Sequence, residues 1–363
     1  MGIELAWYLS CDGDGAHLGL QQPEVPLSAE TLGAIARNAE RAGFTTILVP
    51  TAQVSAHYGS NAPTWDSIVN ASVVALATKT IKLLLAVRVG VIDPAICART
   101  LASLDHLSGG RILYNVVTGG APLAMYGEEV DHDERYRRTE EYLRVLDGLW
   151  TQERFSFEGK FYRLKNATLW PKPLQKPRIP LFLAGSSEIA REIALRLAEY
   201  SVFWGENPEQ VGERVRYFEE RLAGTGKKLK YVTRFHVIAR ETESEAREAA
   251  EEMLSRIDPE VAAARQKVLA GYESQGTRDQ QARVRQEWTG PNLWTGLGRI
   301  RDGAAVAIVG SYRQCAEKII ELEQVGVDML ILSGFPLHSE CERVGKHVIP
   351  LVREMERSLA ARP

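Results

Sequence analysis

Tyr231-Val-Thr-Arg-Phe-His-Val-Ile-Ala-Arg240 is the stretch of this 363-residue sequence that indicates its fold most directly. Its nearly continuous apolar character is typical of a strand covered on both faces, as in a parallel sheet. Arg234 and His236 interrupt that character, and because strand side chains alternate between faces, both project to the same side. A buried unpaired charge is costly, so this pair predicts a carboxylate or an anionic ligand opposite it.

Further short apolar runs alternate with stretches of helical periodicity on both sides of this segment. The predicted strands are residues 3–9, 46–49, 81–87, 112–117, 179–184, 201–204, 232–239 and 329–332. The predicted helices are residues 29–42, 67–77, 95–107, 135–149, 188–199, 208–223, 312–325 and 342–360. This alternation predicts βαβ crossovers, and eight strands with eight helices predict an α/β fold of the (β/α)8 (TIM) barrel type, as a single domain over residues 1–363. Active sites of such barrels gather at the C-terminal ends of the strands.

Two insertions interrupt the alternation. Residues 153–178 contain Phe155-Ser-Phe-Glu-Gly-Lys-Phe-Tyr162, whose alternating pattern predicts a β-hairpin before a proline-rich connection. Residues 242–303 form a long polar segment with a charged helical half and a half rich in Gly, Arg and Gln. Because this second insertion directly follows the Arg234/His236 strand, we expect it to be a mobile lid.

The composition narrows the class of partner. The 44 Lys and Arg residues nearly balance the 47 Asp and Glu residues, so no charge asymmetry indicates nucleic acid or a membrane surface, and a small-molecule substrate is expected. Cys11, Cys97, Cys315 and Cys341 form no CxxC pair, which argues against a zinc site and a disulfide scaffold. Residues 1–10 lack the pattern of a signal peptide, and no apolar run reaches the roughly 18–20 residues that span a bilayer, so we expect a cytoplasmic protein.

Several common cofactor motifs are missing. The sequence has neither a GxGxxG dinucleotide fingerprint nor a GxxxxGK[ST] phosphate loop, which argues against a dedicated nicotinamide domain. The first predicted strand ends Leu9-Ser-Cys-Asp12, without the HxH pair of metal-dependent hydrolase barrels. We therefore expect no metal site.

Three segments at predicted strand or helix ends are candidates for ligand binding. Gly185-Ser186-Ser187 follows a strand and opens a helix, so it is either a phosphate site or an ordinary serine N-cap. Asn115-Val-Val-Thr-Gly119 offers an amide and a hydroxyl at the barrel mouth. In His132-Asp-Glu-Arg-Tyr136, either the segment only caps the next helix or Tyr136 reaches a ligand phosphate.

The predicted lid ends with Arg299 and Arg301. Arginines on polar loops are usually solvated. The alternative is that this end of the lid meets Arg234 on the barrel and completes a clamp for a planar or tetrahedral anion.

Short motifs in a characteristic order extend along nearly the whole chain. They are Gly13-Asp-Gly15 with Leu18-Gly19, Leu48-Val-Pro-Thr51, Ala86-Val-Arg88, Ala98-Arg99, Leu104-Asp-His-Leu-Ser-Gly-Gly-Arg111, Asn115-Val-Val-Thr-Gly-Gly120, Glu134-Arg-Tyr136, Gly185-Ser-Ser187, Trp204-Gly-Glu206, Arg234-Phe-His-Val-Ile238, Asn292-Leu-Trp294 with Gly296 and Gly298, and Leu332-Ser-Gly-Phe-Pro336. With them the sequence resembles the bacterial luciferase-like flavin monooxygenases, and most closely the two-component FMNH2-dependent alkanesulfonate monooxygenases.

The resemblance implies a specific chemistry. Such enzymes are luciferase-like (β/α)8 barrels that receive reduced FMN (FMNH2) from a separate NAD(P)H-dependent flavin reductase. They use O2 through a flavin C4a-peroxide to convert an alkanesulfonate to an aldehyde and sulfite. Relatives assemble as homodimers or homotetramers through the second and third helices.

The resemblance also assigns roles to residues of this chain. His236, Arg234 and Arg301 would be catalytic, binding the sulfonate or the peroxide and managing the proton. The residues expected to bind FMN are Asn115, Thr118, Tyr136, Gly185, Ser186, Ser187 and Trp204. The residues expected to contact the substrate are Ser55, Trp7 and Phe335.

Two departures from the family pattern bear on the substrate. Ser55 lies where the family has a cysteine, and Phe335 replaces the tyrosine of a Ser-Gly-Tyr-Pro motif, which removes a phenolic hydroxyl. Residues 132–173 also resemble dimethylsulfone monooxygenases. Alternative functions are therefore oxygenation of another organosulfur compound such as a sulfone, a deazaflavin-dependent oxidoreductase on the same barrel, and a non-catalytic flavin-binding protein.

Overall fold

The computed structural model describes residues 2–118, 126–127, 130–270, 282, 284, 286–301 and 304–361. Within these residues, eight parallel strands close into a barrel: β1 (Glu4–Tyr8), β2 (Thr46–Val49), β3 (Lys82–Arg88), β4 (Ile112–Val117), β7 (Leu181–Ala184), β8 (Tyr200–Trp204), β9 (Lys230–Arg240) and β13 (Met329–Ser333). The barrel closes because β9 pairs with both β8 and β13. Leu83, Leu84 and Leu85 of β3 are all fully buried, as expected for a strand covered by the barrel core and by helices. The predicted TIM barrel is confirmed.

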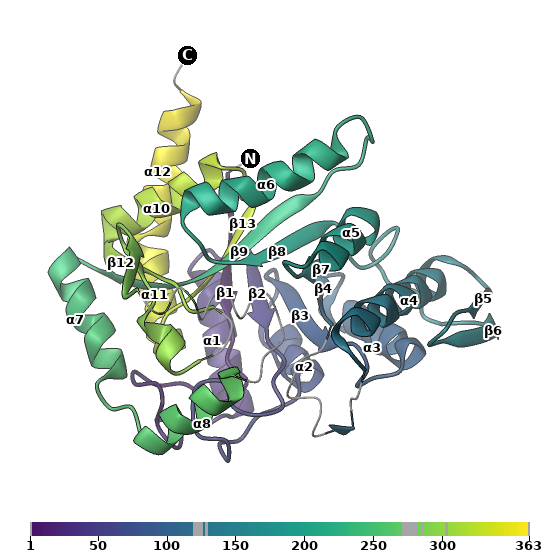
Figure 1. Ribbon diagram of the computed structural model, residues 1–363, viewed down its shortest axis with the longest axis horizontal. Coiled ribbons are helices and arrows are strands. Elements are labelled where there is room, and N and C mark those ends of the chain that lie inside the picture. The colour runs from purple at the N-terminus through teal and green to yellow at the C-terminus, as the bar shows by residue number, and fades with distance from the viewer. Residues whose placement is uncertain are drawn as a thin grey trace.

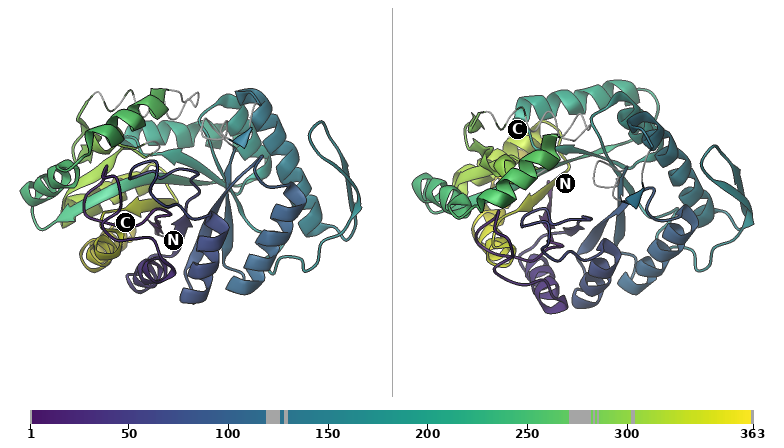
Figure 2. Two further views of the ribbon diagram at one scale, coloured as in Figure 1. Left: turned by 90° about the horizontal axis from the view of Figure 1, so that it is seen from below. Right: turned by 60° about the horizontal axis from the view of Figure 1, so that its bottom comes forward.

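Helices surround the barrel (Figures 1 and 2). They are α1 (Ala29–Arg41), α2 (Ser67–Ala77), α3 (Pro94–Ser108), α4 (His132–Thr151), α5 (Glu188–Leu197), α6 (Pro208–Leu222), α10 (Tyr312–Gln324), α11 (Leu337–His347) and α12 (Ile349–Ala360). The single helix predicted over residues 342–360 is wrong, because α11 ends before Pro350, which lacks a backbone N–H and lies in the first turn of α12. None of the described helices combines the length and apolar character that crossing a bilayer requires.

The first insertion forms the predicted hairpin. β5 (Phe155–Glu158) and β6 (Arg163–Ala167) pair in antiparallel fashion. Figure 1 shows this hairpin beyond α4, far from the centre of the barrel. The hairpin therefore has no part in forming the barrel mouth.

The described part of the second insertion contains more regular secondary structure than its polar sequence indicates. It contains α7 (Glu243–Leu254), α8 (Pro259–Ala270), β10 (Trp288–Gly290), β11 (Leu293–Trp294) and the 3-10 helix η2 (Gly296–Arg299), and is followed by β12 (Ala307–Ser311). Residues 271–281, 283, 285, 302 and 303 of the predicted lid lie outside the described residues. The strand β12 was not predicted; it pairs in parallel with the second half of β9.

The described part of this insertion lies against the loops that follow β1 and β2. Asp258 N donates to Gly19 O over 2.9 Å, and Arg265 donates to Ser55 O. Figures 1 and 2 show α7 and α8 beside the dark purple loops of the N-terminal region. The insertion therefore reaches the C-terminal mouth of the barrel, while its mobility stays a prediction.

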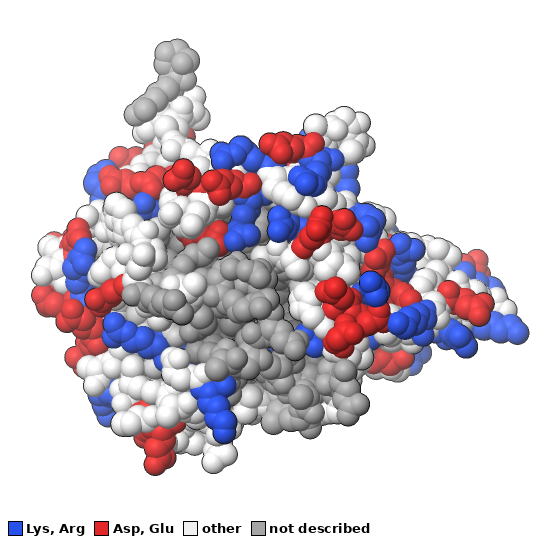
Figure 3. Space-filling model, viewed as in Figure 1, with Lys and Arg blue, Asp and Glu red and all other residues white. Residues whose placement is uncertain are grey.

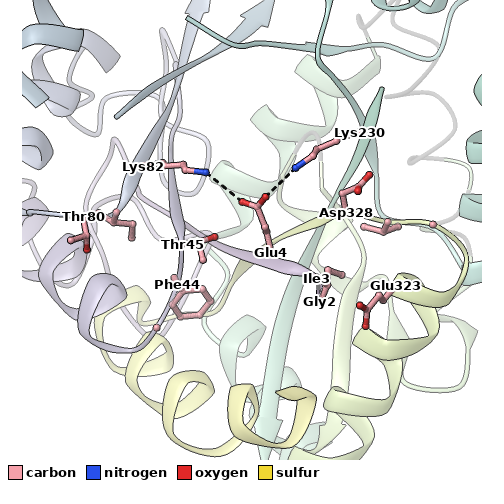
Figure 4. A pocket seen from close by; sticks show the side chains of 14 residues that line it. Gly2, Ile3, Glu4, Phe44, Thr45, Thr80, Lys82, Lys230, Glu323 and Asp328 are labelled. Carbon is pink, nitrogen blue, oxygen red and sulfur yellow. Dashed lines mark hydrogen bonds and ion pairs between the residues drawn. The ribbon is translucent and has the colours of Figure 1, made fainter. Parts of the chain in front are cut away.

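The opposite, N-terminal mouth contains an open pocket (Figure 4). Glu4 lies between Lys230 and Lys82 there, with N···O distances of 3.5 and 3.9 Å. On the face in Figure 3, acidic and basic side chains are interspersed wherever residues are coloured by charge. The described surface of this face therefore shows no patch of a single sign.

Candidate active site

Strand β9 places Arg234 and His236 at the C-terminal mouth. In the barrel register, Arg234 lies beside Trp204 at the end of β8, and His236 lies beside Ser333 at the end of β13. Both side chains are buried, with exposed fractions of 5% and 1%. The alternation inferred from the sequence therefore holds, and the pair lies where barrel enzymes carry their chemistry.

Arg234 is a buried cation. Its guanidinium lies over the Tyr8 ring at 3.9 Å, and its Nη2 is 3.5 Å from Ser333 Oγ. Its Nε is buried without a hydrogen-bond partner, and no carboxylate of the described residues forms an ion pair with it. Burial, with a contribution from Arg301, lowers the pKa of Arg234 to about 9, so the group remains protonated at neutral pH. Such a charge favours an anionic ligand.

Arg301 joins this pair from the end of the second insertion. Its Nη1 is 2.9 Å from His236 Nε2 and 3.2 Å from His57 Nε2. Burial and the two neighbouring guanidinium groups hold the pKa of His236 well below its ordinary value. The structure thus brings together Arg234, His236 and Arg301, the three predicted catalytic residues, around a neutral imidazole.

A second pair, Asp12 and His57, completes the cluster and was missed from the sequence. His57 Nδ1 lies 2.9 Å from Asp12 Oδ1, and both side chains are fully enclosed. Asp12 also accepts hydrogen bonds from Ser10 Oγ, Ser55 Oγ and the backbone N–H groups of Ala56 and His57. The sequence signal that they share is weak, since each only follows a predicted strand.

The two members of this pair carry different charges. Burial tends to raise the pKa of Asp12, but His57 and the hydroxyl donors of Ser10 and Ser55 lower it below the ordinary value. Burial lowers the pKa of His57, and Asp12 opposes this shift only in part. At neutral pH the pair is therefore a carboxylate beside a neutral imidazole.

The three predicted substrate residues lie in different environments. Phe335 lines the cluster, with its ring 5.1 Å from that of His57 and 5.8 Å from that of His236. Ser55 is 1% exposed, and its hydroxyl donates to Asp12 over 2.6 Å, so it supports the carboxylate. Trp7 is not part of the cluster: it lies 5.0 Å from Phe44 and donates through Nε1 to Leu337 O. The adjacent Tyr8, on the other face of β1, contacts Arg234 instead.

Most of the predicted FMN residues form a second group at the ends of β4 and β7 and near the start of α4, whereas Trp204 lies at the end of β8 beside Arg234. Asn115 Oδ1 and the hydroxyl oxygens of Thr118, Ser186 and Ser187 are buried without hydrogen-bond partners among the described residues. Ser187 is the N-cap of α5, yet its side chain makes no capping hydrogen bond. This observation disfavours the ordinary N-cap alternative and leaves these hydroxyls available for a ligand.

Gly185 and Tyr136 lie within the same group. A Cβ on Gly185 would lie 2.5 Å from Ala190 Cβ and 3.0 Å from the Tyr136 hydroxyl, so only glycine fits. Burial raises the pKa of Tyr136, and the nearby hydroxyls of Ser187 and Thr118 moderate the shift without meeting hydrogen-bond geometry. The unpartnered polar atoms beside a helix N-terminus fit the phosphate group of FMN. Residues 119–125, which include Gly119 and Gly120 of the predicted motif, lie outside the described residues.

The fold and the two groups define the class: a (β/α)8 barrel with a buried Arg/His cluster and a separate group of unpartnered polar atoms at its C-terminal mouth. Residues 7–329 match the family model described as luciferase-like monooxygenase, and the chain belongs to this family. Among the described residues, no group of three or more His, Cys, Asp or Glu side chains is arranged to hold a metal ion.

Solved structures with the same fold include three flavin-related or oxygenase proteins. A riboflavin lyase in complex with modified FMN and riboflavin is 22% identical, with a TM-score of 0.81, covering 98% of this chain and 92% of that one. The EDTA monooxygenase from Chelativorans sp. BNC1 is 21% identical, with a TM-score of 0.79 and coverage of 98% and 94%. A long-chain alkane monooxygenase is 20% identical, with a TM-score of 0.79 and coverage of 98% and 92%.

Proposed function

We propose that this protein is an FMNH2-dependent, two-component monooxygenase that desulfonates an alkanesulfonate to an aldehyde and sulfite. It would receive reduced FMN from a separate NAD(P)H-dependent reductase and consume O2. The observation that carries the proposal is Arg234, a buried guanidinium without a carboxylate among the described residues, next to Arg301 and a neutral His236. A sulfonate is a permanent anion and supplies the missing charge.

The residues that would hold FMN are Asn115, Thr118, Tyr136, Gly185, Ser186 and Ser187, together with Trp204, which lies beside Arg234 in the strand register. When bound, reduced FMN would supply the electrons that activate O2. The chain supplies the rest: Arg234 and Arg301 bind and orient the anion, and His236 accepts or returns a proton at a ring nitrogen. The second insertion, held against the loops after β1 and β2, excludes water from the mouth.

Assembly as a homodimer or homotetramer is part of the proposal. Large apolar side chains are exposed on the adjacent helices α2 and α3, including Leu76 at 69% and Ile96 at 57%. Exposed apolar surface of this kind is typical of a protein interface. Sedimentation velocity of the wild type and of Leu76→Glu measures whether this face holds the subunits together.

The alternatives differ in the charge of the substrate or in the cofactor. A sulfone is neutral and would leave Arg234 without a counter charge, so the cluster favours a sulfonate. A coenzyme F420-dependent secondary alcohol dehydrogenase shares the fold at 18% identity and a TM-score of 0.69, so a deazaflavin-dependent reaction remains a second candidate. The presence of a neutral His236 beside two arginines supports an enzyme over a non-catalytic flavin-binding protein.

The test supplies photoreduced FMN and O2 to the purified protein together with alkanesulfonates of increasing chain length, and dimethylsulfone as a neutral control. We expect O2 uptake matched by sulfite and aldehyde release with a sulfonate, and no product from the sulfone. Oxidation of a secondary alcohol with F420 and without O2 would instead support the dehydrogenase. Flavin binding without turnover of any substrate would support the non-catalytic alternative.

A further inference from the structure

Arg301 Nη1 faces two imidazole nitrogens, Nε2 of His57 and Nε2 of His236. A guanidinium nitrogen only donates hydrogen bonds, so a histidine that binds it must be neutral and must carry its proton on Nδ1. Whether each histidine meets this condition depends on the group that faces its Nδ1. The two histidines differ in that group.

The tautomer of His57 is fixed by Asp12. Its Nδ1 faces a carboxylate that already accepts hydrogen bonds from two hydroxyls and two backbone N–H groups. An ionised carboxylate can only accept, so Nδ1 must carry the proton and Nε2 must be an acceptor. His57 therefore offers Arg301 an acceptor in every neutral state of the site.

The tautomer of His236 is not fixed by its neighbours. Its Nδ1 lies 2.9 Å from Ser333 Oγ, and a hydroxyl either donates or accepts. Its Nε2 lies 2.9 Å from Arg301 Nη1, a donor, and 3.1 Å from Ala304 O, an acceptor. With the proton on Nδ1, His236 accepts from Arg301; with the proton on Nε2, it donates to Ala304 O and accepts from Ser333.

We propose that His57, with its tautomer set by Asp12, is the positioning residue that holds Arg301 at the barrel mouth, so that His236 can exchange its proton between its two ring nitrogens without releasing the arginine. The holding role concerns the protein alone. The proton exchange rests on the proposed function, in which His236 serves the reaction.

Burial raises the cost of breaking the hydrogen bonds in this arrangement. Asp12, His57, Arg301 and His236 are each at most 5% exposed, so water does not readily replace a lost hydrogen bond. The Asp12 carboxylate also balances the charge of Arg301 through His57. Within the described cluster this leaves Arg234 as the cation whose charge is not balanced, and therefore as the main attraction for an incoming anion.

Two substitutions of His57 separate the positioning role from a purely structural one. The amide nitrogen in His57→Asn occupies the place of Nδ1, so it retains the contact with Asp12 and loses the acceptor for Arg301. The side-chain oxygen in His57→Gln reaches the place of Nε2, so it retains an acceptor for Arg301 and loses the Asp12 contact. Thermal unfolding verifies that both variants are folded.

Hydrogen–deuterium exchange of the flavin-free protein measures how firmly the turn that carries Arg301 is held in place. The amides of Gly298, Ile300 and Arg301 are bonded within the turn that precedes and includes this arginine, and they report its opening. We expect His57→Asn to accelerate exchange of a peptide from residues 286–301 about tenfold, and His57→Gln to leave it within about twofold of the wild type. Equal exchange in both variants, or the reverse order, would overturn the proposal.

Nitrogen-15 spectra of histidine-labelled protein near pH 7 test the tautomers directly. We expect the His57 ring to carry its proton on Nδ1, and we expect this state to be lost when Asp12 is replaced by Asn. A His57 ring protonated on Nε2 in the wild type contradicts the holding role. Neither experiment uses flavin or substrate, so both stand if the sulfonate assay fails.

The effect of His57 on catalysis is measured with enzyme that is supplied with reduced FMN, O2 and a sulfonate. If sulfite release is observed, His57→Asn should raise KM at least about tenfold through misplacement of Arg301, whereas His236→Asn should mainly lower kcat. An unchanged KM in His57→Asn would show that Arg301 does not act through His57.

Discussion

The two mouths of the barrel hold their charged groups in opposite ways. At the N-terminal mouth the side chains of Glu4, Lys82 and Lys230 are 25%, 48% and 47% exposed, so water solvates each ion (Figure 4). At the C-terminal mouth Arg234 and Arg301 are each 5% exposed. Solvated ion pairs contribute little to stability, whereas buried charges are costly and are concentrated at functional sites. The difference supports the proposal that the active site lies at the C-terminal mouth, even though the N-terminal mouth also contains an open pocket.

Replacement of Arg234 should give the largest effect and should separate activity from stability. We expect Arg234→Met to lower kcat/KM for the best sulfonate at least about a thousandfold, which corresponds to about 4 kcal/mol, because the anion loses its main cation. The same substitution should leave the melting temperature unchanged or raise it, since it removes a buried charge that lacks a counter charge. Sulfite release and differential scanning calorimetry measure the two quantities. A marked fall in melting temperature would show that Arg234 is paired in the folded protein.

Replacement of Asp12, unlike replacement of Arg234, should lower stability, because hydrogen-bond donors surround the Asp12 carboxylate in the folded protein. Asp12→Asn places an amide N–H₂ among groups that donate hydrogen bonds, including Ser55 Oγ and His57 Nδ1. We expect the free energy of unfolding to fall by about 3 kcal/mol in a urea titration. Ser55→Ala, which removes only one of these donors, is the matched control and should cost about 1 kcal/mol. A loss below 1 kcal/mol for Asp12→Asn would contradict the buried network.

Arg234 could be predicted as a site residue from the sequence, whereas Asp12 could not, and the reason lies in where each residue is placed in the fold. Arg234 and His236 were identified because an apolar strand with two polar residues at a spacing of two has only one geometry. Arg301 was identified from its position at the end of the predicted lid and from the family resemblance, and in the structure it lies next to His236. The family resemblance placed Trp7 among the substrate residues, but the neighbouring Tyr8, on the other face of β1, is the residue that contacts Arg234.

Asp12 and His57 could not be paired in this way. They lie 45 positions apart in loops after different strands, and their contact depends on how both loops fold over the mouth. No periodicity relates residues in two such loops. The strand β12 was missed for a similar reason, since its partner, the second half of β9, extends beyond the closed barrel. Sequence patterns therefore predicted the barrel and the polar residues at its strand ends. The Asp12–His57 contact and strand β12 depend on tertiary contacts that such patterns do not describe.

The buried histidines predict a smaller effect that depends on pH. The pKa values of His57 and His236 are lowered in the folded protein, mainly by burial. Below the ordinary histidine pKa of about 6.5 the unfolded chain binds protons that the folded chain does not. Stability is therefore fully present above this pH and is lost as the pH falls, by up to about 1.4 kcal/mol per pH unit for each histidine.

Urea titrations at pH 7.5 and 5.5 measure this loss in the wild type and in His57→Gln. The difference between the two proteins cancels the contribution of other groups, such as His17, whose pKa is raised mainly by its hydrogen bond to Glu252. We expect the variant to lose less stability on acidification, by roughly 1 kcal/mol, because only about one pH unit of this interval lies below the ordinary histidine pKa. Identical losses would mean that His57 is protonated in the folded wild type.

Glu4 at the N-terminal mouth should give the smallest effect. Its contacts with Lys230 and Lys82 are 3.5 and 3.9 Å long and exposed, so Glu4→Gln should change the free energy of unfolding by less than about 1 kcal/mol. Added salt should reduce even this difference, because exposed charges are screened within about 10 Å at 0.1 M ionic strength. The KM for the sulfonate should remain that of the wild type, because Glu4 lies at the opposite end of the barrel from Arg234. A changed KM would mean that the N-terminal pocket communicates with the substrate, and the functional separation of the two mouths would then fail.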